Sequence, residues 1–192
     1  GAGIIRPELE VRDGRVVRVR VDMGQPRLKR RQIPMAGEPA DEPVIDVPIA
    51  VGEREVAVTC VSMGNPHCVV FAEELSDELV RGMGPQIENH ELFPQRTNVE
   101  FVRVEGPDRL VMRVWERGAG ETMACGTGAC ASLVAAALTG RSGKKATIKL
   151  LGGELEIEWA DDGHVYMTGP ASEVFSGEIS GEFMEELKAA AW

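Results

Sequence analysis

The stretch of sequence that most constrains this fold is residues 128–139, which carry almost no polar side chain. Its alanines and leucines favour a helix, and Gly140 directly after it is a typical helix C-cap. A helix that is apolar on every face has no side to turn toward water, so it is expected to be buried all round. The rest of the chain must therefore form a shell around this helix.

Much of the remaining sequence alternates apolar and charged residues, as residues 17–22 do, and this pattern is typical of half-buried strands. Strands are predicted at residues 17–21, 44–49, 55–62, 68–71, 98–104, 109–116, 145–150, 154–159, 164–168 and 173–179. Helical spacing predicts further helices at residues 73–81, 85–90 and 183–191. We therefore expect an α+β fold in which a mixed, barrel-like sheet wraps around one central buried helix.

A cysteine stands at the start of the apolar helix, within residues 124–128 (ACGTG). The unpaired N–H groups and the positive dipole end of a helix N-terminus favour thiolate over thiol, which predicts a lowered pKa for Cys125. Gly126 and Gly128 leave room for an anionic group of a substrate to approach the same N–H groups. The alternative is a buried cysteine with only a packing role.

Composition narrows the classes of partner. The chain has 192 residues and a net charge of −10, whereas binding to nucleic acid needs clustered Lys and Arg. No window of about 18 apolar residues occurs, so no membrane span is expected. The four cysteines could form two disulfides, but the acidic, Met-containing composition and the absence of a signal-like start favour a cytoplasmic protein with reduced thiols. Cys60, His67 and Cys68 lack the spacing of a zinc site, so no metal is expected.

His67 ends a break between strands at residues 64–67 (GNPH) and is a candidate proton partner for a thiol, although a structural histidine fits equally well. Glu116 and Arg117 close a strand just before the glycine-rich turn. The carboxylate is placed to accept a proton from Cys125 and the guanidinium to grip a substrate carboxylate, unless the two form a surface ion pair.

Asn65 and Asn98 both lie beside turns, where asparagine commonly caps or turns the backbone. Local sequence therefore favours a backbone role for both residues and does not by itself assign them as substrate contacts.

Four motifs together resemble the diaminopimelate epimerase family: residues 64–67 (GNPH), 96–100 (RTNVE), 115–122 (WERGAGET) and 124–128 (ACGTG). Their order and spacing also match, and the likeness spans roughly residues 1–179. The resemblance implies the diaminopimelate epimerase-like fold and an enzyme that interconverts LL- and meso-diaminopimelate in lysine and peptidoglycan biosynthesis. It further implies an isomerase that needs neither pyridoxal phosphate nor metal and that works as a homodimer.

The resemblance also implies two thiols on opposite faces of the α-carbon, since inversion requires a proton source on each face. A dry pocket rich in donors would stabilise the carbanion between them. Carried onto this sequence, Cys125 is one base, Glu116 its proton-relay partner, and His67 serves the opposing thiol. The residues expected to line the substrate are Asn65, Asn98, Glu116, Arg117, Gly126 and Thr127.

One motif of the family, a second cysteine within Cys-Gly-Asn-Gly, does not occur in this chain. We therefore expect residues 1–25 to be a remnant of an N-terminal domain, 26–170 a complete C-terminal domain, and 171–192 a strand and helix that return to the first. The chain alone is predicted to be inactive and to need a missing N-terminal segment or a companion chain.

Three other functions fit the same residues. They are another racemase of this fold that needs no pyridoxal phosphate, such as a proline racemase relative, a thiol hydrolase using Cys125 and His67, and a binding fragment without catalysis.

Overall fold

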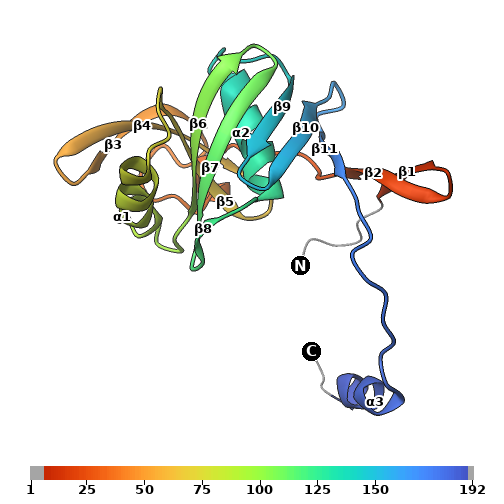
Figure 1. Ribbon diagram of the computed structural model, residues 1–192. Helices are drawn as coiled ribbons and strands as arrows, with labels where there is room; N and C mark the ends of the chain where they lie inside the picture. Colours follow the sequence, from red (N-terminus) through yellow and green to blue (C-terminus); the bar gives the residue numbers. More distant parts are fainter. Residues whose placement is uncertain (1–6, 190–192) are drawn as a thin grey trace.

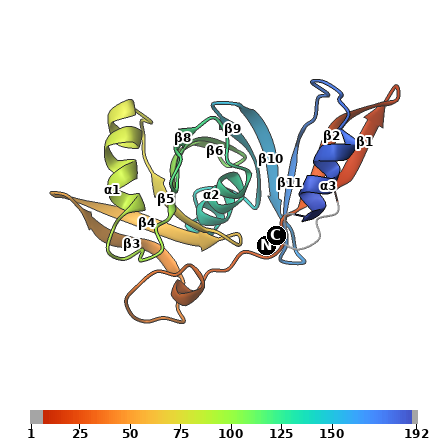
Figure 2. The same cartoon turned by 90° about the horizontal axis from the view of Figure 1, so that it is seen from below.

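The apolar helix predicted from the sequence is α2 (Gly126–Leu138), and each of its residues from Gly128 to Ala136 is buried. In the computed structural model, which describes residues 7–189, a mixed sheet curves around this helix (Figures 1 and 2). The prediction of an α+β fold with a sheet wrapped around a central helix is confirmed. The sheet is open, however, because β1 and β3 are its two edges.

The strands pair in the order β1-β2-β11-β10-β9-β7-β6-β5-β4-β3, and the short β8 adds to β7. Their bounds are β1 (Glu8–Arg12), β2 (Arg15–Asp22), β3 (Val44–Val51), β4 (Arg54–Ser62), β5 (Pro66–Phe71), β6 (Asn98–Gly106), β7 (Arg109–Glu116), β8 (Gly120–Thr122), β9 (Lys145–Leu150), β10 (Gly153–Trp159) and β11 (Val165–Pro170). Nine of the ten predicted strands therefore form, with ends that differ by a few residues at most.

Two neighbouring pairs are parallel, β5 with β6 and β7 with β9, and a parallel pair needs a long crossover connection. The crossover from β7 to β9 contains α2, which places that helix on the inner face of the sheet. The crossover from β5 to β6 contains a π-helical segment (Glu78–Met83) that runs directly into α1 (Gly84–Glu88). The two helices predicted at residues 73–81 and 85–90 are thus one continuous helical segment, which starts later than expected.

The two faces of the sheet pack into separate cores, because successive side chains of a strand point to opposite faces. The inner core contains α2 together with residues such as Val69 and Leu110. The outer core joins Phe101 and its neighbours to Ile87 of α1. In Figure 2, α2 lies inside the curve of the sheet, and α1 lies on the other side of β5 and β6.

The first two strands and the segment that follows β11 adjoin each other at the β1 end of the sheet, where the Ala171 N–H donates to the Val17 carbonyl. The β1–β2 hairpin joins the sheet through pairing of β2 with β11. The strand predicted at residues 173–179 does not form, and Val174 and Phe175 are exposed there. A strand needs a neighbour for its backbone hydrogen bonds, and both edges of β11 are already occupied by β2 and β10.

After this irregular segment the chain forms α3 (Gly181–Ala189), set away from the sheet in Figure 1. The C-terminal helix predicted from the sequence thus forms, although residues 190–191 of its predicted range lie outside the described residues. The division into residues 1–25, 26–170 and 171–192 stays a prediction. Within residues 7–189, no helix combines the length and the apolar character that crossing a membrane requires.

Candidate active site

The topology brings the predicted site residues to one end of the sheet. Because β5 and β6 are parallel, they start at the same edge, where His67 lies opposite Asn98. Strand β7 runs antiparallel to β6 and ends there, with Trp115 paired to Val99 and Glu116 following. The turn after β8 then leads into the N-terminus of α2. Segments far apart in the sequence therefore meet around Cys125.

Cys125 is the N-cap residue of α2, with an extended backbone and 7% of its surface exposed. Its Sγ accepts the Gly128 N–H at 3.4 Å and lies 3.5 Å from the Thr127 hydroxyl. The N–H groups of Gly126 and Thr127 have no hydrogen-bond partner within residues 7–189, as expected for the first turn of a helix. A sulfur and two free donors thus share one helix N-terminus, an arrangement suited to holding an anion.

The pKa of Cys125 is raised, not lowered as the sequence predicted. Burial of the thiol is the largest cause, and the carboxylates of Glu100 and Glu116 add to it, so the pKa rises to about 11. The hydrogen bonds from Thr127 and Gly128 oppose this effect without overcoming it. In this chain, Cys125 is therefore a neutral thiol at pH 7.

His67 is fully buried and is bonded on both ring nitrogens. Its Nδ1 lies 2.7 Å from Glu100 Oε1, and its Nε2 lies 3.1 Å from Asn65 Oδ1. The Asn65 amide in turn donates to the Thr127 hydroxyl at 3.2 Å, and that hydroxyl contacts the Cys125 sulfur. A continuous line of polar contacts therefore joins the buried Glu100–His67 pair to the thiol.

Glu100 belongs to this network but was not predicted as a site residue. It is fully buried, and its Oε2 has no hydrogen-bond partner within the described chain. A Cβ atom at Gly128 would lie only 2.7 Å from Glu100 Oε1, so the carboxylate packs directly against the first turn of α2. The signal that could have revealed it is an acidic residue between the apolar residues Val99 and Phe101 of a predicted strand, since acidic residues are rarely buried without a partner.

Asn98 is engaged with the backbone at both ends of its amide. Its Nδ2 donates to the Pro66 carbonyl at 2.9 Å, and its Oδ1 accepts the Arg117 N–H at 2.9 Å. Asn98 therefore connects the start of β5 to the end of β7. The side chain of Arg117 is exposed and donates to the Gln95 carbonyl at 3.0 Å.

Glu116 accepts a hydrogen bond from the Thr122 hydroxyl. It influences the Cys125 pKa through its charge, but within residues 7–189 no hydrogen bond joins the two side chains. Its assignment as the proton-relay partner of Cys125 stays a prediction.

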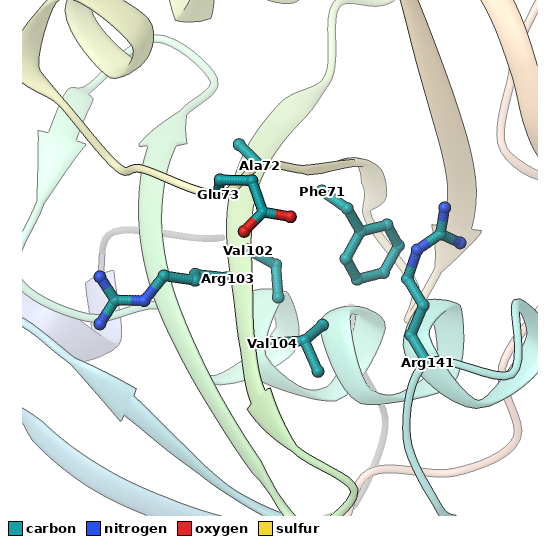
Figure 3. Close-up of a pocket in the computed structure, with 7 residues that line it drawn as sticks. All are labelled: Phe71, Ala72, Glu73, Val102, Arg103, Val104 and Arg141. Carbon is teal, nitrogen blue, oxygen red and sulfur yellow. The ribbon is translucent and has the colours of Figure 1, made fainter.

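A surface hollow of about 400 Å³ lies elsewhere, lined by Phe71, Ala72, Glu73, Val102, Arg103, Val104 and Arg141 (Figure 3). Arg141 follows the C-terminal end of α2 and stacks on the Phe71 ring at 4.5 Å. Cys125 caps the opposite end of this helix, about 20 Å away for its length. The hollow is therefore separate from the thiol. Within the described residues, no cluster of three or more His, Cys, Asp or Glu side chains is arranged to hold a metal ion.

Two solved structures share this fold at low sequence identity. A probable proline racemase from Agrobacterium radiobacter matches with a TM-score of 0.65 and 17% identity, over 94% of this chain and 58% of the racemase. A hydroxyproline epimerase from Agrobacterium vitis matches with a TM-score of 0.63 and 17% identity, over 88% and 54%. The fold is thus one used by amino-acid racemases and epimerases.

Sequence comparison narrows this class. A profile of the family described as diaminopimelate epimerase matches residues 59–174. The diaminopimelate epimerase of Moorella thermoacetica is 61% identical over 93% of this chain, and that of Pelotomaculum thermopropionicum is 56% identical over 92%. The chain belongs to the diaminopimelate epimerase family. It spans 63% and 62% of the length of these two relatives.

Proposed function

We propose that this chain carries one half of the active site of an epimerase that needs no cofactor and interconverts LL- and meso-diaminopimelate. The observation that carries the proposal is the position of Cys125 at the N-terminus of α2, beside two free backbone donors, in a chain of this family. Participation in lysine and peptidoglycan biosynthesis follows from the same proposal. A homodimer, which rests on the family alone, and a cytoplasmic location, which rests on the composition of the sequence, also belong to the proposal.

In this mechanism, the α-carboxylate of the substrate accepts the N–H groups of Gly126 and Thr127. That contact sets the α-carbon next to the Cys125 sulfur. A thiolate on the other face of the α-carbon removes its proton, and the Cys125 S–H gives its own proton to the carbon from the opposite side. The C–H bond that breaks and the C–H bond that forms balance, and the two sulfurs exchange protonation states.

The neutral state of Cys125 fits the proton donor in this direction of the reaction. Its raised pKa keeps the sulfur protonated until a carbanion develops beside it. The carbanion would be stabilised by the two backbone donors on its carboxylate and by exclusion of water. Arg117 and Asn65 are proposed to contact the rest of the substrate, since both lie at the same end of the sheet.

The opposing thiolate has to come from outside this chain. Cys60 and Cys68 belong to the outer core, on the face of the sheet away from α2, and Cys130 is inside α2. Each of these three residues is at most 1% exposed. We therefore propose that the chain alone is inactive and that a segment carrying the Cys-Gly-Asn-Gly motif completes the site.

The test is complementation in D₂O. This chain is combined with the N-terminal segment of a full-length family member, and deuterium at the α-carbon of diaminopimelate is followed by NMR together with the LL-to-meso ratio. We expect exchange and epimerisation only when both parts are present. Cys125→Ala should abolish both signals, whereas Cys130→Ala, a matched change at a buried cysteine of the same helix, should retain them.

Three outcomes would contradict the proposal. Turnover by the chain alone would overturn the half-site, and preferential turnover of proline or hydroxyproline would indicate a different racemase. Cleavage of an acyl substrate through a covalent Cys125 adduct, without α-deuteration, would indicate a thiol hydrolase.

A further inference from the structure

We propose that Glu88, at the end of α1, is a positioning residue that sets the direction of Arg117 at the substrate site. The inference rests on the proposed function for the role of Arg117, but the contact itself does not. Glu88 is only 5% exposed and lies in the crossover that leads to β6, outside the four motifs found in the sequence. A buried carboxylate of this kind requires partners, and its partners are informative.

Three hydrogen-bond donors converge on the Glu88 carboxylate. Oε1 accepts the Gly118 N–H at 2.8 Å and an Arg96 guanidinium N–H at 3.2 Å. Oε2 accepts the indole N–H of Trp115 at 2.8 Å. Two of these donors flank Arg117, one before it and one after it in the chain. Glu88 therefore holds the end of β7 and the turn that follows.

The backbone of Arg117 is held by two consecutive N–H groups, its own and that of Gly118, whose acceptors belong to different elements. Its own N–H donates to Asn98 on β6, and the next N–H, that of Gly118, donates to Glu88 on α1. Gly118 has a φ of +79°, a left-handed conformation that suits glycine. With the backbone fixed on both sides, the Cα–Cβ bond of Arg117 leaves the turn in a defined direction, and the guanidinium is held by the Gln95 carbonyl at 3.0 Å. The side chain therefore has less conformational freedom to lose when it grips a carboxylate.

Close packing of α1 against β7 allows the Glu88 carboxylate to reach the turn after β7. A Cβ atom at Gly84 would lie 2.7 Å from the Trp115 ring, so glycine allows the first turn of α1 to rest on the indole. Glu88 is one helical turn further along and meets the edge of the same ring. The indole and the turn after β7 are thus held by one helix.

All three partners are donors, so the site is specific for a carboxylate. A glutamine at position 88 has one acceptor oxygen and an NH₂ group, which would face a donor. If its oxygen kept the Gly118 and Arg96 contacts, its NH₂ group would meet the Trp115 indole N–H. The conflict should therefore disappear when the indole donor is removed.

The first experiment uses the chain itself and NMR of its backbone and indole N–H groups. Glu88→Gln should shift the resonances of Trp115, Arg117 and Gly118, whereas Glu91→Gln, an exposed glutamate three residues on, should not. In the Trp115→Phe background, adding Glu88→Gln should leave the Arg117 and Gly118 resonances close to those of Trp115→Phe alone. If Glu88→Gln moves these amides no more than Glu91→Gln does, or if the double variant is not rescued, the inference is wrong.

The second experiment uses the complemented enzyme. Loss of a substrate-positioning contact should raise KM for diaminopimelate about tenfold in Glu88→Gln and leave kcat within about twofold. An equal loss in kcat with unchanged KM would overturn the positioning role. If the complemented wild-type protein does not epimerise diaminopimelate, the proposed function fails, while the NMR result still decides whether Glu88 holds the turn.

Discussion

The protonation state of Cys125 gives the sharpest prediction, because two parts of its surroundings act in opposite directions. The helix N-terminus favours thiolate, whereas burial and two carboxylates favour thiol and raise the pKa from an ordinary 9.0 to about 11. At pH 8 the thiolate would then be about 0.1% of the population, compared with about 9% for an unperturbed thiol. Alkylation should therefore be about 100-fold slower at this pH than for an unperturbed thiol of equal access.

The assay is iodoacetamide labelling of Cys125 in this chain between pH 7 and pH 10, followed by mass spectrometry of the peptide. Restricted access lowers the rate by the same factor at every pH, so the slope reports the pKa independently of exposure. We expect the rate to rise about tenfold for each pH unit across the whole range. The background is low because the other cysteines are buried, and Cys125→Ala measures it.

Glu100→Gln tests the cause of the shift. Glu100 is the larger of the two carboxylate contributions, so neutralising it should lower the Cys125 pKa and increase labelling at pH 8. A labelling rate that levels off near pH 7 in the wild-type chain would refute the reasoning, because it would mean that the helix N-terminus outweighs burial.

The same shift links folding to pH. A thiol whose pKa is raised by folding stabilises the folded state below the unfolded pKa of 9.0 and loses that contribution as pH rises toward about 11. A shift of this size corresponds to about 2.7 kcal/mol. The free energy of unfolding, measured with urea, should be lower at pH 10.5 than at pH 8 in the wild-type chain. The decrease should be smaller in Cys125→Ala.

Two substitutions in the surroundings of the thiol test the packing and the hydrogen bonds. Gly128→Ala places a Cβ atom 2.7 Å from Glu100 Oε1 and should lower the free energy of unfolding by about 2 kcal/mol, whereas Gly82→Ala, where a Cβ meets nothing within 4 Å, should change it little. Asn98→Asp turns the donor that faces the Pro66 carbonyl into an acceptor and should cost about 2 kcal/mol or more. Urea denaturation measures each change, and equal stability of the two glycine variants, or an unaffected Asn98→Asp, would contradict the corresponding contact.

Local sequence was sufficient for the elements whose cause is local. The apolar run in α2 predicted its burial, the alternation of charged and apolar residues predicted nearly all strands, and Cys125 was correctly placed at a helix N-terminus. The predicted strand at residues 173–179 failed because a strand also needs a neighbour for its backbone hydrogen bonds, and both edges of the preceding strand, β11, are occupied, which local pattern does not encode.

The sequence by itself determined the family, the buried helix and the position of its thiol, since the helix and its N-terminal cysteine depend on neighbouring residues and the family on motifs whose order along the chain is visible without the fold. Only the tertiary structure decided the chemistry of that thiol, because Glu100 and Glu116 reach it from β6 and β7 and the surrounding strands exclude water. It likewise decided that Glu88 on α1 meets the turn after β7. Electrostatic and hydrogen-bonding effects depend on distance in space, and here the groups that produce them come from two strands of the sheet and from α1, in the crossover between β5 and β6.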